Sequence, residues 1–94
     1  MISFSCYNIQ YHKHPVEEWV VVSGDIRNDS PKSYHTAAFR LKLFAGQECI
    51  GASILKVQGF GSKCTRSFEV VIEGVHFNAV PNITRCDILF ETVY

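Results

Sequence analysis

The sequence has no excess of charge of either sign, because nine Lys and Arg residues balance nine Asp and Glu residues. Proteins that bind nucleic acids rely on a basic surface that displaces counterions from the phosphates. We therefore predict no nucleic-acid partner.

Long apolar runs are also lacking. No stretch approaches the roughly 20 apolar residues that a helix needs to cross a bilayer, so we expect no membrane span in this segment. The N-terminal residues 1–6 have neither the basic region nor the apolar run of a signal peptide. This absence slightly favours an intracellular location.

Motifs for metal binding and catalysis are missing as well, since no Cys-x-x-Cys or His-Glu-x-x-His spacing occurs. His12 and His14 share one face of an extended segment, but a metal site needs further ligands, and His35, His76 or a cysteine would have to converge on them. The turn at 59–62 resembles a phosphate-binding loop only superficially, because such loops open a helix and a strand follows here. We therefore expect a protein that is not an enzyme and that holds no metal and no cofactor.

What the chain does have is enough apolar material for one core. Its 94 residues are 47% hydrophobic and 13% aromatic, which is typical of a folded domain and not of a disordered segment. No linker, internal repeat or low-complexity tract interrupts it. We predict a single domain spanning 1–94, either as a whole protein or as one domain of a larger one.

Turn-forming residues recur at short intervals, and the runs between them alternate apolar and polar residues with period two. This punctuation predicts an all-β fold, an immunoglobulin-like β-sandwich of about seven antiparallel strands in two sheets. The six clear runs are Ser3–Tyr11, Glu18–Asn28, His35–Phe44, Cys49–Val57, the segment around Phe68–Ile72, and Thr84–Val93, with a short seventh strand expected around Val75–Val80.

The alternation also predicts which side chains share a face. A phase slip near Cys6–Tyr7 in the first run indicates a bulge or a strand that changes sheet. Gly24 leaves a gap in the second run that a large neighbour can fill. The expected apolar stripes are Val20, Val22 and Ile26; Ala37, Phe39, Leu41 and Leu43; Ile50, Ala52 and Ile54; Phe68, Val70 and Ile72; and Cys86, Ile88 and Phe90.

The central half of the chain, from Val20 to Ile72, resembles the FxLYD family of immunoglobulin-like domains. The family's Gly-x-hydrophobic-x-Asn-x-Ser turn corresponds to Gly24–Ser30, and its Leu-Tyr-Asp strand corresponds to Phe39–Ala45, where Phe and Ala replace Tyr and Asp. Its next two elements correspond to Ile50-Gly51 and to Phe68–Val70. The resemblance implies an immunoglobulin-like fold, and domains of this family are commonly found in surface or secreted proteins.

The four cysteines, Cys6, Cys49, Cys64 and Cys86, are irregularly spaced. Without a signal peptide we favour reduced thiols. In an oxidised domain the expected disulfide joins Cys6 and Cys86, because the first and last strands are neighbours in many sandwiches.

Four aromatic residues, Trp19, Tyr34, Phe44 and Phe60, fall at strand ends, at turns or on the polar face. They either form a partly buried rim of the core or a partner-binding patch, since aromatic residues dominate interface hot spots.

The sequence favours a non-catalytic protein-interaction or scaffolding module. It is expected to bind a protein partner or a second copy of itself, through an aromatic patch or through the edge of the first or last strand. The alternative is an extracellular or cell-surface accessory or adhesion domain with a Cys6–Cys86 disulfide.

Overall fold

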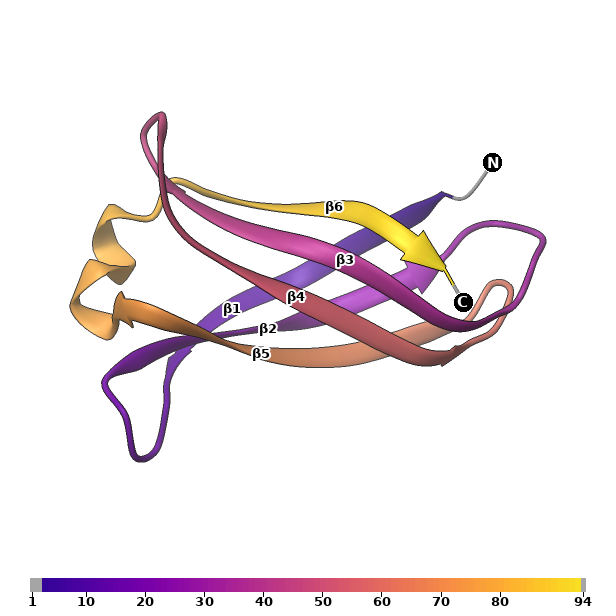
Figure 1. Ribbon diagram of the computed structural model, residues 1–94, viewed down its shortest axis with the longest axis horizontal. Helices are drawn as coiled ribbons and strands as arrows, with labels where there is room; N and C mark the ends of the chain where they lie inside the picture. Colours follow the sequence, from indigo (N-terminus) through magenta and orange to yellow (C-terminus); the bar gives the residue numbers. More distant parts are fainter. Residues whose placement is uncertain (1–2, 94) are drawn as a thin grey trace.

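The computed structural model describes residues 3–93. It contains six strands and one short 3-10 helix, η1 (Figure 1). No helix in the described part of the chain is long and apolar enough to cross a membrane. In chain order the elements are β1 (Phe4–Lys13), β2 (Trp19–Asn28), β3 (Tyr34–Ala45), β4 (Glu48–Phe60), β5 (Thr65–His76), η1 (Phe77–Asn82) and β6 (Arg85–Val93).

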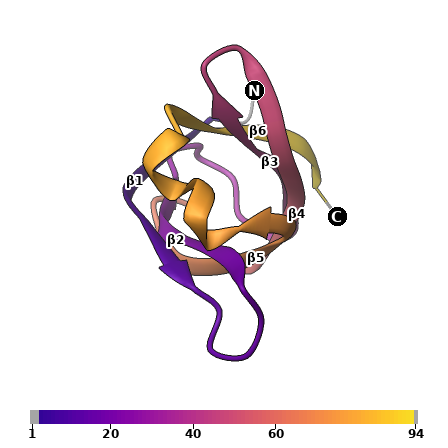
Figure 2. The ribbon, with the colours of Figure 1, turned by 90° about the vertical axis from the view of Figure 1, so that its left-hand side faces the viewer.

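The strands form two three-stranded antiparallel sheets that pack face to face. The first sheet has the order β1-β2-β5 and the second has the order β4-β3-β6. In the view along the long axis, β4 and β5 are adjacent on one side, and β1 and β6 flank the opposite side (Figure 2). The prediction of an all-β chain with two antiparallel sheets is confirmed.

The strand count is six and not seven. The segment expected to form a short strand around Val75–Val80 instead ends β5 at His76 and continues as η1. The His76 imidazole accepts a hydrogen bond from the backbone N–H of Asn78 and so caps this helix. Pro81, which lies inside it, has no N–H to donate to a strand ladder.

Three of the expected apolar stripes form the core as predicted. Gly24 also behaves as expected, because a Cβ placed there would lie 2.7 Å from Cδ1 of Ile9 and 3.1 Å from the ring of Phe68. The bulge in the first strand is confirmed by a register shift between Tyr7 and Gln10. The buried stripes are Val20, Val22 and Ile26 on β2; Ala37, Phe39, Leu41 and Leu43 on β3; and Phe68, Val70 and Ile72 on β5.

Ile50 is half-buried and packs against the core as expected, but further along β4 the inward face is the opposite of the one that Ala52 and Ile54 indicate. Ile54 is 43% exposed, whereas Leu55 and Val57 are buried. A bulge pairs Leu43 with Gly51 and Phe44 with Cys49, which leaves Ile50 as the extra residue. Beyond Ile50 the core side of β4 therefore continues with a glycine, and a pattern based on apolar residues misses it.

Gly51 allows β4 and β5 to approach each other closely. A Cβ at this position would lie 2.3 Å from Cγ2 of Val75 and 2.8 Å from Cγ2 of Ile72. Both of these β5 side chains are buried. The missing side chain at Gly51 is therefore what closes this side of the sandwich.

The loops at one end of the sandwich are joined by a buried polar cluster centred on Asn28. Its side-chain amide donates to the carbonyl oxygens of Lys32 (2.8 Å) and Phe60 (3.1 Å), and its Oδ1 accepts from the backbone N–H (3.0 Å) and the hydroxyl (2.7 Å) of Ser30. Asn28 and Ser30 are each 1% exposed. Asn28 and Ser30 therefore cap this turn, and Asn28 also ties the turn to the end of β4.

We predict that Gly51→Ala destabilises the domain by roughly 1–3 kcal/mol, because the added methyl group overpacks a filled part of the core. Denaturant unfolding measures the change in the free energy of unfolding. Val75→Ala in the same background should recover part of the loss by making room, and a Gly51→Ala variant as stable as the wild type contradicts the proposed closure.

We predict that Asn28→Asp lowers the free energy of unfolding by at least about 2 kcal/mol. The new carboxylate cannot donate to the two carbonyl oxygens, so three buried acceptors face one another. Thermal and denaturant unfolding measure the loss. Asn82→Asp is the matched control, because Asn82 is exposed at the end of η1; equal effects at both positions rule out the cluster as a structural hub.

Candidate protein-binding edge

β1 and β6 are end strands on the side of the sandwich opposite β4 and β5. Neither strand pairs with a further strand among residues 3–93 (Figure 2). Their outer backbone N–H and C=O groups therefore form two free edges, as predicted for the first and last strands. We call the region between these two strands the seam.

The seam is lined by half-buried apolar side chains, whereas the β4–β5 side is fully buried. Leu55, Val57 and Ile72 on that closed side are at most 5% exposed. The half-buried seam residues that pack against the core are Phe4, Cys6, Ile9 and Tyr11 from β1 and Cys86 and Ile88 from β6. The core is therefore complete on one side and open on the other.

Phe39 holds the two sides of the seam together. The centroid of its fully buried ring lies 4.7 Å from that of Phe4 on β1 and 6.0 Å from that of Phe90 on β6, and both pairs have edge-to-face geometry. A third ring, that of Phe60, lies 6.3 Å away. Such aromatic pairs add to the burial energy and fix ring orientation, so β6 is anchored near its C-terminal end.

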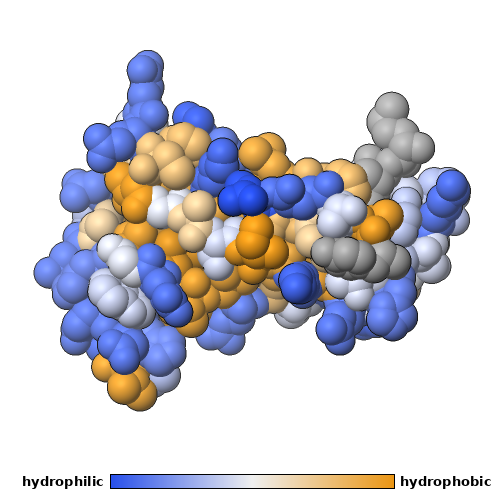
Figure 3. All heavy atoms as spheres, viewed as in Figure 1, coloured by the Kyte–Doolittle hydropathy of each residue, from blue (hydrophilic) through white to orange (hydrophobic). Residues whose placement is uncertain are grey.

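β6 also exposes apolar surface. Leu89 is 50% exposed on the outer face, and Phe90, whose ring faces Phe39, is still 37% exposed. Arg40 of β3 is the register partner of Leu89 on one side and of Ile54 of β4 on the other. The exposed side chains of Leu89 and Ile54 therefore flank Arg40 on the outer face of the sheet. Figure 3 shows apolar atoms on both sides of a hydrophilic row that crosses this face.

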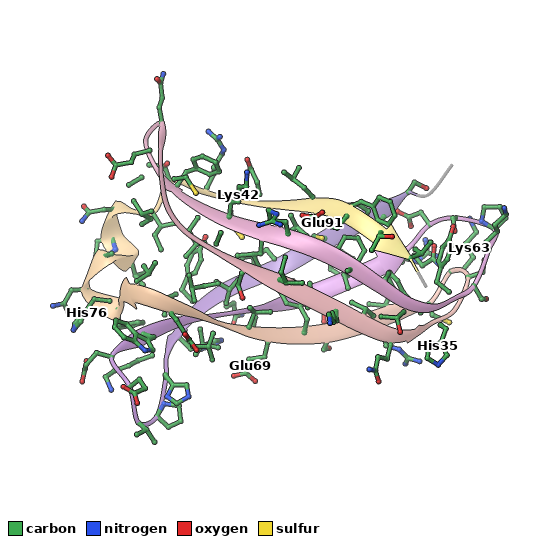
Figure 4. The ribbon with its side chains drawn as sticks, viewed as in Figure 1. His35, Lys42, Lys63, Glu69, His76 and Glu91 are labelled. Atoms are coloured by element: carbon green, nitrogen blue, oxygen red, sulfur yellow. The ribbon has the colours of Figure 1, made fainter. Side chains whose placement is uncertain are left out.

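The same face carries charges of both signs. Arg40 Nε lies 2.5 Å from Glu91 Oε1, and Arg85 Nε lies 3.1 Å from Asp87 Oδ2. The Arg85 guanidinium also stacks on the ring of Phe44, 4.0 Å from its centroid. Figure 4 shows Glu91 and Lys42 on this face, over β6 and β3. All four paired groups keep at least a third of their surface exposed, so each pair contributes little to stability.

Of the two free edges, β6 is the more regular. The bulge of β1 falls in the middle of the strand, with Asn8 at a φ of 57°, and bulges of this kind disrupt pairing with a new strand. The Asn8 side chain donates to the half-buried Asp25, and this hydrogen bond and another from Ser67 lower the pKa of that carboxyl. In β6 the register shifts only past Phe90, which leaves Arg85–Phe90 as an uninterrupted edge.

The outer face of the other sheet has a shallow hollow of about 350 Å³. Asp25 lies at this hollow, with Asn8 and Ser67 as hydrogen-bond donors. The carboxylate that a ligand would meet there is already held by its neighbours. We assign no function to the hollow.

Cys6 and Cys86 lie at the seam on opposite sheets, and both are free thiols. Burial raises the pKa of each thiol to about 11. Asp87 and then Cys6 raise the pKa of Cys86 further, and burial and then Cys86 raise that of Tyr11. The effects of Cys6 on Cys86 and of Cys86 on Tyr11 place these three side chains near one another at the seam, whereas Cys49 and Cys64 are exposed elsewhere.

The four aromatic residues predicted to bind a partner do not form one surface. Tyr34 and Phe60 are paired at the end of the sheet where β3 begins, and Phe44 lies near the other end of β3. Trp19 begins β2 in the other sheet, paired with His76. Phe60 is only 1% exposed, so the expectation that it binds a partner is wrong: it closes the core beneath the turn that Asn28 holds.

The histidines are engaged locally and do not converge. His12 Nε2 lies 2.8 Å from the hydroxyl of Ser23, and His14 Nδ1 accepts hydrogen bonds from two backbone N–H groups of its own turn. His35 and His76 lie toward opposite ends of the molecule (Figure 4). Within residues 3–93 no three His, Cys, Asp or Glu side chains are grouped as metal ligands.

Sequence reasoning did not single out Leu89, the most exposed apolar residue of β6. The signal that reveals it is an apolar residue between two acidic ones, Asp87 and Glu91, on the polar face of the last strand. An apolar side chain on an otherwise charged face is common and means little alone. It gains meaning here because the strand is a free edge.

Comparison of the chain with protein-family models, with curated proteins and with solved structures finds no match. The resemblance to the FxLYD family therefore stays a prediction.

We predict that iodoacetamide at about pH 8 alkylates Cys49 and Cys64 well before Cys6 and Cys86, whose raised pKa values keep them protonated. The rates at the two seam thiols should rise as the pH approaches 11, where their thiolates form. Peptide mass spectrometry over a time course measures this order. If Cys6 and Cys86 react only after a reductant is added, they form a disulfide; equal rates at all four cysteines contradict the assigned burial.

Proposed function

We propose that this chain is an immunoglobulin-like, non-catalytic protein-interaction module that binds an extended protein strand along the free edge of β6. The observation that carries the proposal is the asymmetry of the core. Gly51 lets β4 and β5 close one side, while apolar side chains at the β1–β6 seam stay half-buried.

The sheet orders support the immunoglobulin-like assignment. In immunoglobulin variable-type sandwiches one sheet contains strands A, B and E, and the other contains C′, C, F and G in that order. The orders β1-β2-β5 and β4-β3-β6 correspond to A-B-E and C′-C-F. In that scheme the place beside β6 belongs to a seventh strand, G, and no strand of residues 3–93 occupies it.

An incoming strand at this place gains two kinds of interaction. Its backbone satisfies the outer N–H and C=O groups of β6, which supplies affinity, and its alternate side chains supply specificity. Side chains on its inner face would cover Cys86 and Ile88, and those on its outer face would lie beside Leu89. We expect the partner segment to alternate apolar residues on the inner side.

The test compares two matched surface variants, Leu89→Asp on β6 and Ile54→Asp on β4. Both residues flank Arg40 on the same face and have similar exposure, 50% and 43%, but they lie at opposite edges of the sheet. Sedimentation velocity and capture from native extract, quantified by mass spectrometry, measure self-association and partner retention.

We predict that Leu89→Asp loses the interaction, whether with a partner or with a second copy, and that Ile54→Asp keeps it. Loss in both variants indicates binding by the whole face and not by the edge. A wild-type domain that sediments as a monomer and retains no protein refutes the proposed function.

The alternative role, an extracellular or cell-surface accessory or adhesion domain, is supported by the placement of Cys6 and Cys86 at the same seam on opposite sheets. A disulfide between them would link the two open strands. The alkylation time course distinguishes this oxidised domain from the reduced one.

A further inference from the structure

The outer face of β6 has an order of charges that suits pairing with itself. Reading along the strand, the outward side chains are Arg85, Asp87 and Leu89, and Glu91, the extra residue at the register shift after Phe90, also lies on this face because it pairs with Arg40. When a strand pairs antiparallel with a second copy of itself, a two-fold axis perpendicular to the sheet places each residue opposite its mirror position in the partner. The register of such a pair is set by the residue on the axis.

One register satisfies these charges. With Ile88 on the axis, Arg85 of each copy faces Glu91 of the other, and Asp87 faces Leu89. Because of the symmetry, each dimer contains two Arg85–Glu91 pairs. Opposite charges directly across two strands are stabilising, and like charges are destabilising.

The two adjacent registers that keep the faces aligned oppose like charges. With Asp87 on the axis, that carboxylate faces its own copy. With Leu89 on the axis, Asp87 faces Glu91 in both halves of the dimer. The charge pattern therefore selects the register centred on Ile88.

Resting on the proposed function of the β6 edge, we propose that the strand which occupies it is β6 of a second copy, paired antiparallel about Ile88. The two three-stranded sheets then join into one continuous sheet with the order β4-β3-β6-β6-β3-β4. On its inner side Ile88 meets its own copy and Cys86 meets Phe90, so each copy covers the other's seam.

The local contacts of the charged groups fit this arrangement. Arg85 is held over Phe44 and stays 52% exposed, and Glu91 stays 38% exposed beside Arg40. Each can therefore accept a new partner across the axis without being drawn from a buried site. The balanced charge of the chain, nine of each sign, adds no long-range repulsion between copies.

Charge reversal tests both the pairing and its register. Arg85→Glu places two glutamates opposite each other twice per dimer, and Glu91→Arg does the same with two arginines. We predict that each single variant weakens self-association about tenfold or more, and that the double variant Arg85→Glu/Glu91→Arg recovers it. Sedimentation velocity over a concentration series measures the dissociation constants.

The decisive measurement is a mixture of the two single variants. In the heterodimer, the glutamate introduced at position 85 of one chain faces the arginine introduced at position 91 of the other. The unchanged Glu91 of the first chain faces the unchanged Arg85 of the second, so both pairs again carry opposite charges. Native mass spectrometry separates the heterodimer from both homodimers by mass. We expect the heterodimer to dominate the dimer fraction.

Two controls separate this result from general effects. Lys56→Glu and Glu69→Arg reverse exposed charges on β4 and β5, away from the β6 edge, and should leave self-association unchanged. Circular dichroism and thermal unfolding verify that the single variants are folded. Raising the salt concentration should shrink the difference between the variants, because exposed charges are screened.

The outcomes distinguish this inference from the proposed function. A wild-type monomer at every concentration, or self-association insensitive to both reversals, overturns pairing about Ile88. If a captured protein is still lost in Leu89→Asp and kept in Ile54→Asp, the β6 edge binds a different strand and the proposed function stands. If neither self-association nor capture depends on Leu89, both fail.

Discussion

The architecture depends on the absence of a side chain at Gly51 in β4. At Gly51 there is no Cβ, and so Ile72 and Val75 of β5 can pack directly against β4. Two antiparallel sheets of three strands have four edges in all, and this contact shields one edge of each sheet. The two remaining edges, β1 and β6, are therefore left together on the opposite side. The position of the open seam is a consequence of close packing elsewhere.

The two open strands are not held equally. β1 pairs with β2 on both sides of a bulge and is further fixed by side-chain hydrogen bonds, such as that from Asn8 to Asp25. β6 has the ladder with β3 and the contact between Phe90 and Phe39, and its ion pair with β3, Arg40–Glu91, is exposed and adds little. An edge strand with exposed apolar side chains is stabilised most by a new partner strand. The added pairing satisfies the free backbone groups of β6 and at the same time buries Leu89. This difference is the physical reason to assign binding to β6.

The sequence predicts the strands well wherever an inward stripe consists of large apolar residues, as in β2, β3 and β5. It fails in β4 beyond Ile50, because the next inward position is Gly51 and the bulge at Ile50 shifts the phase, so Ala52 and Ile54 mark the wrong face. The prediction for Phe60 is wrong for a related reason. Its burial depends on the turn that Asn28 holds from a strand distant in the sequence. The position of the seam cannot be predicted from the sequence either. Contacts between strands decide which edges of the two sheets lie together, and the periodicity within one strand carries no information about them.

Edge strands must avoid indiscriminate pairing, and natural proteins commonly achieve this with charges on the edge. β6 has such charges in Arg85, Asp87 and Glu91, yet their signs are mixed and not uniform. A uniform row repels every copy in every register, whereas a mixed row repels in some registers and attracts in one. Shifting the pairing by a single step in either direction along β6 opposes carboxylates. The same residues that protect the edge from random strands therefore specify the one arrangement in which it can pair with itself, which is how specificity arises when repulsion and attraction are combined in one surface.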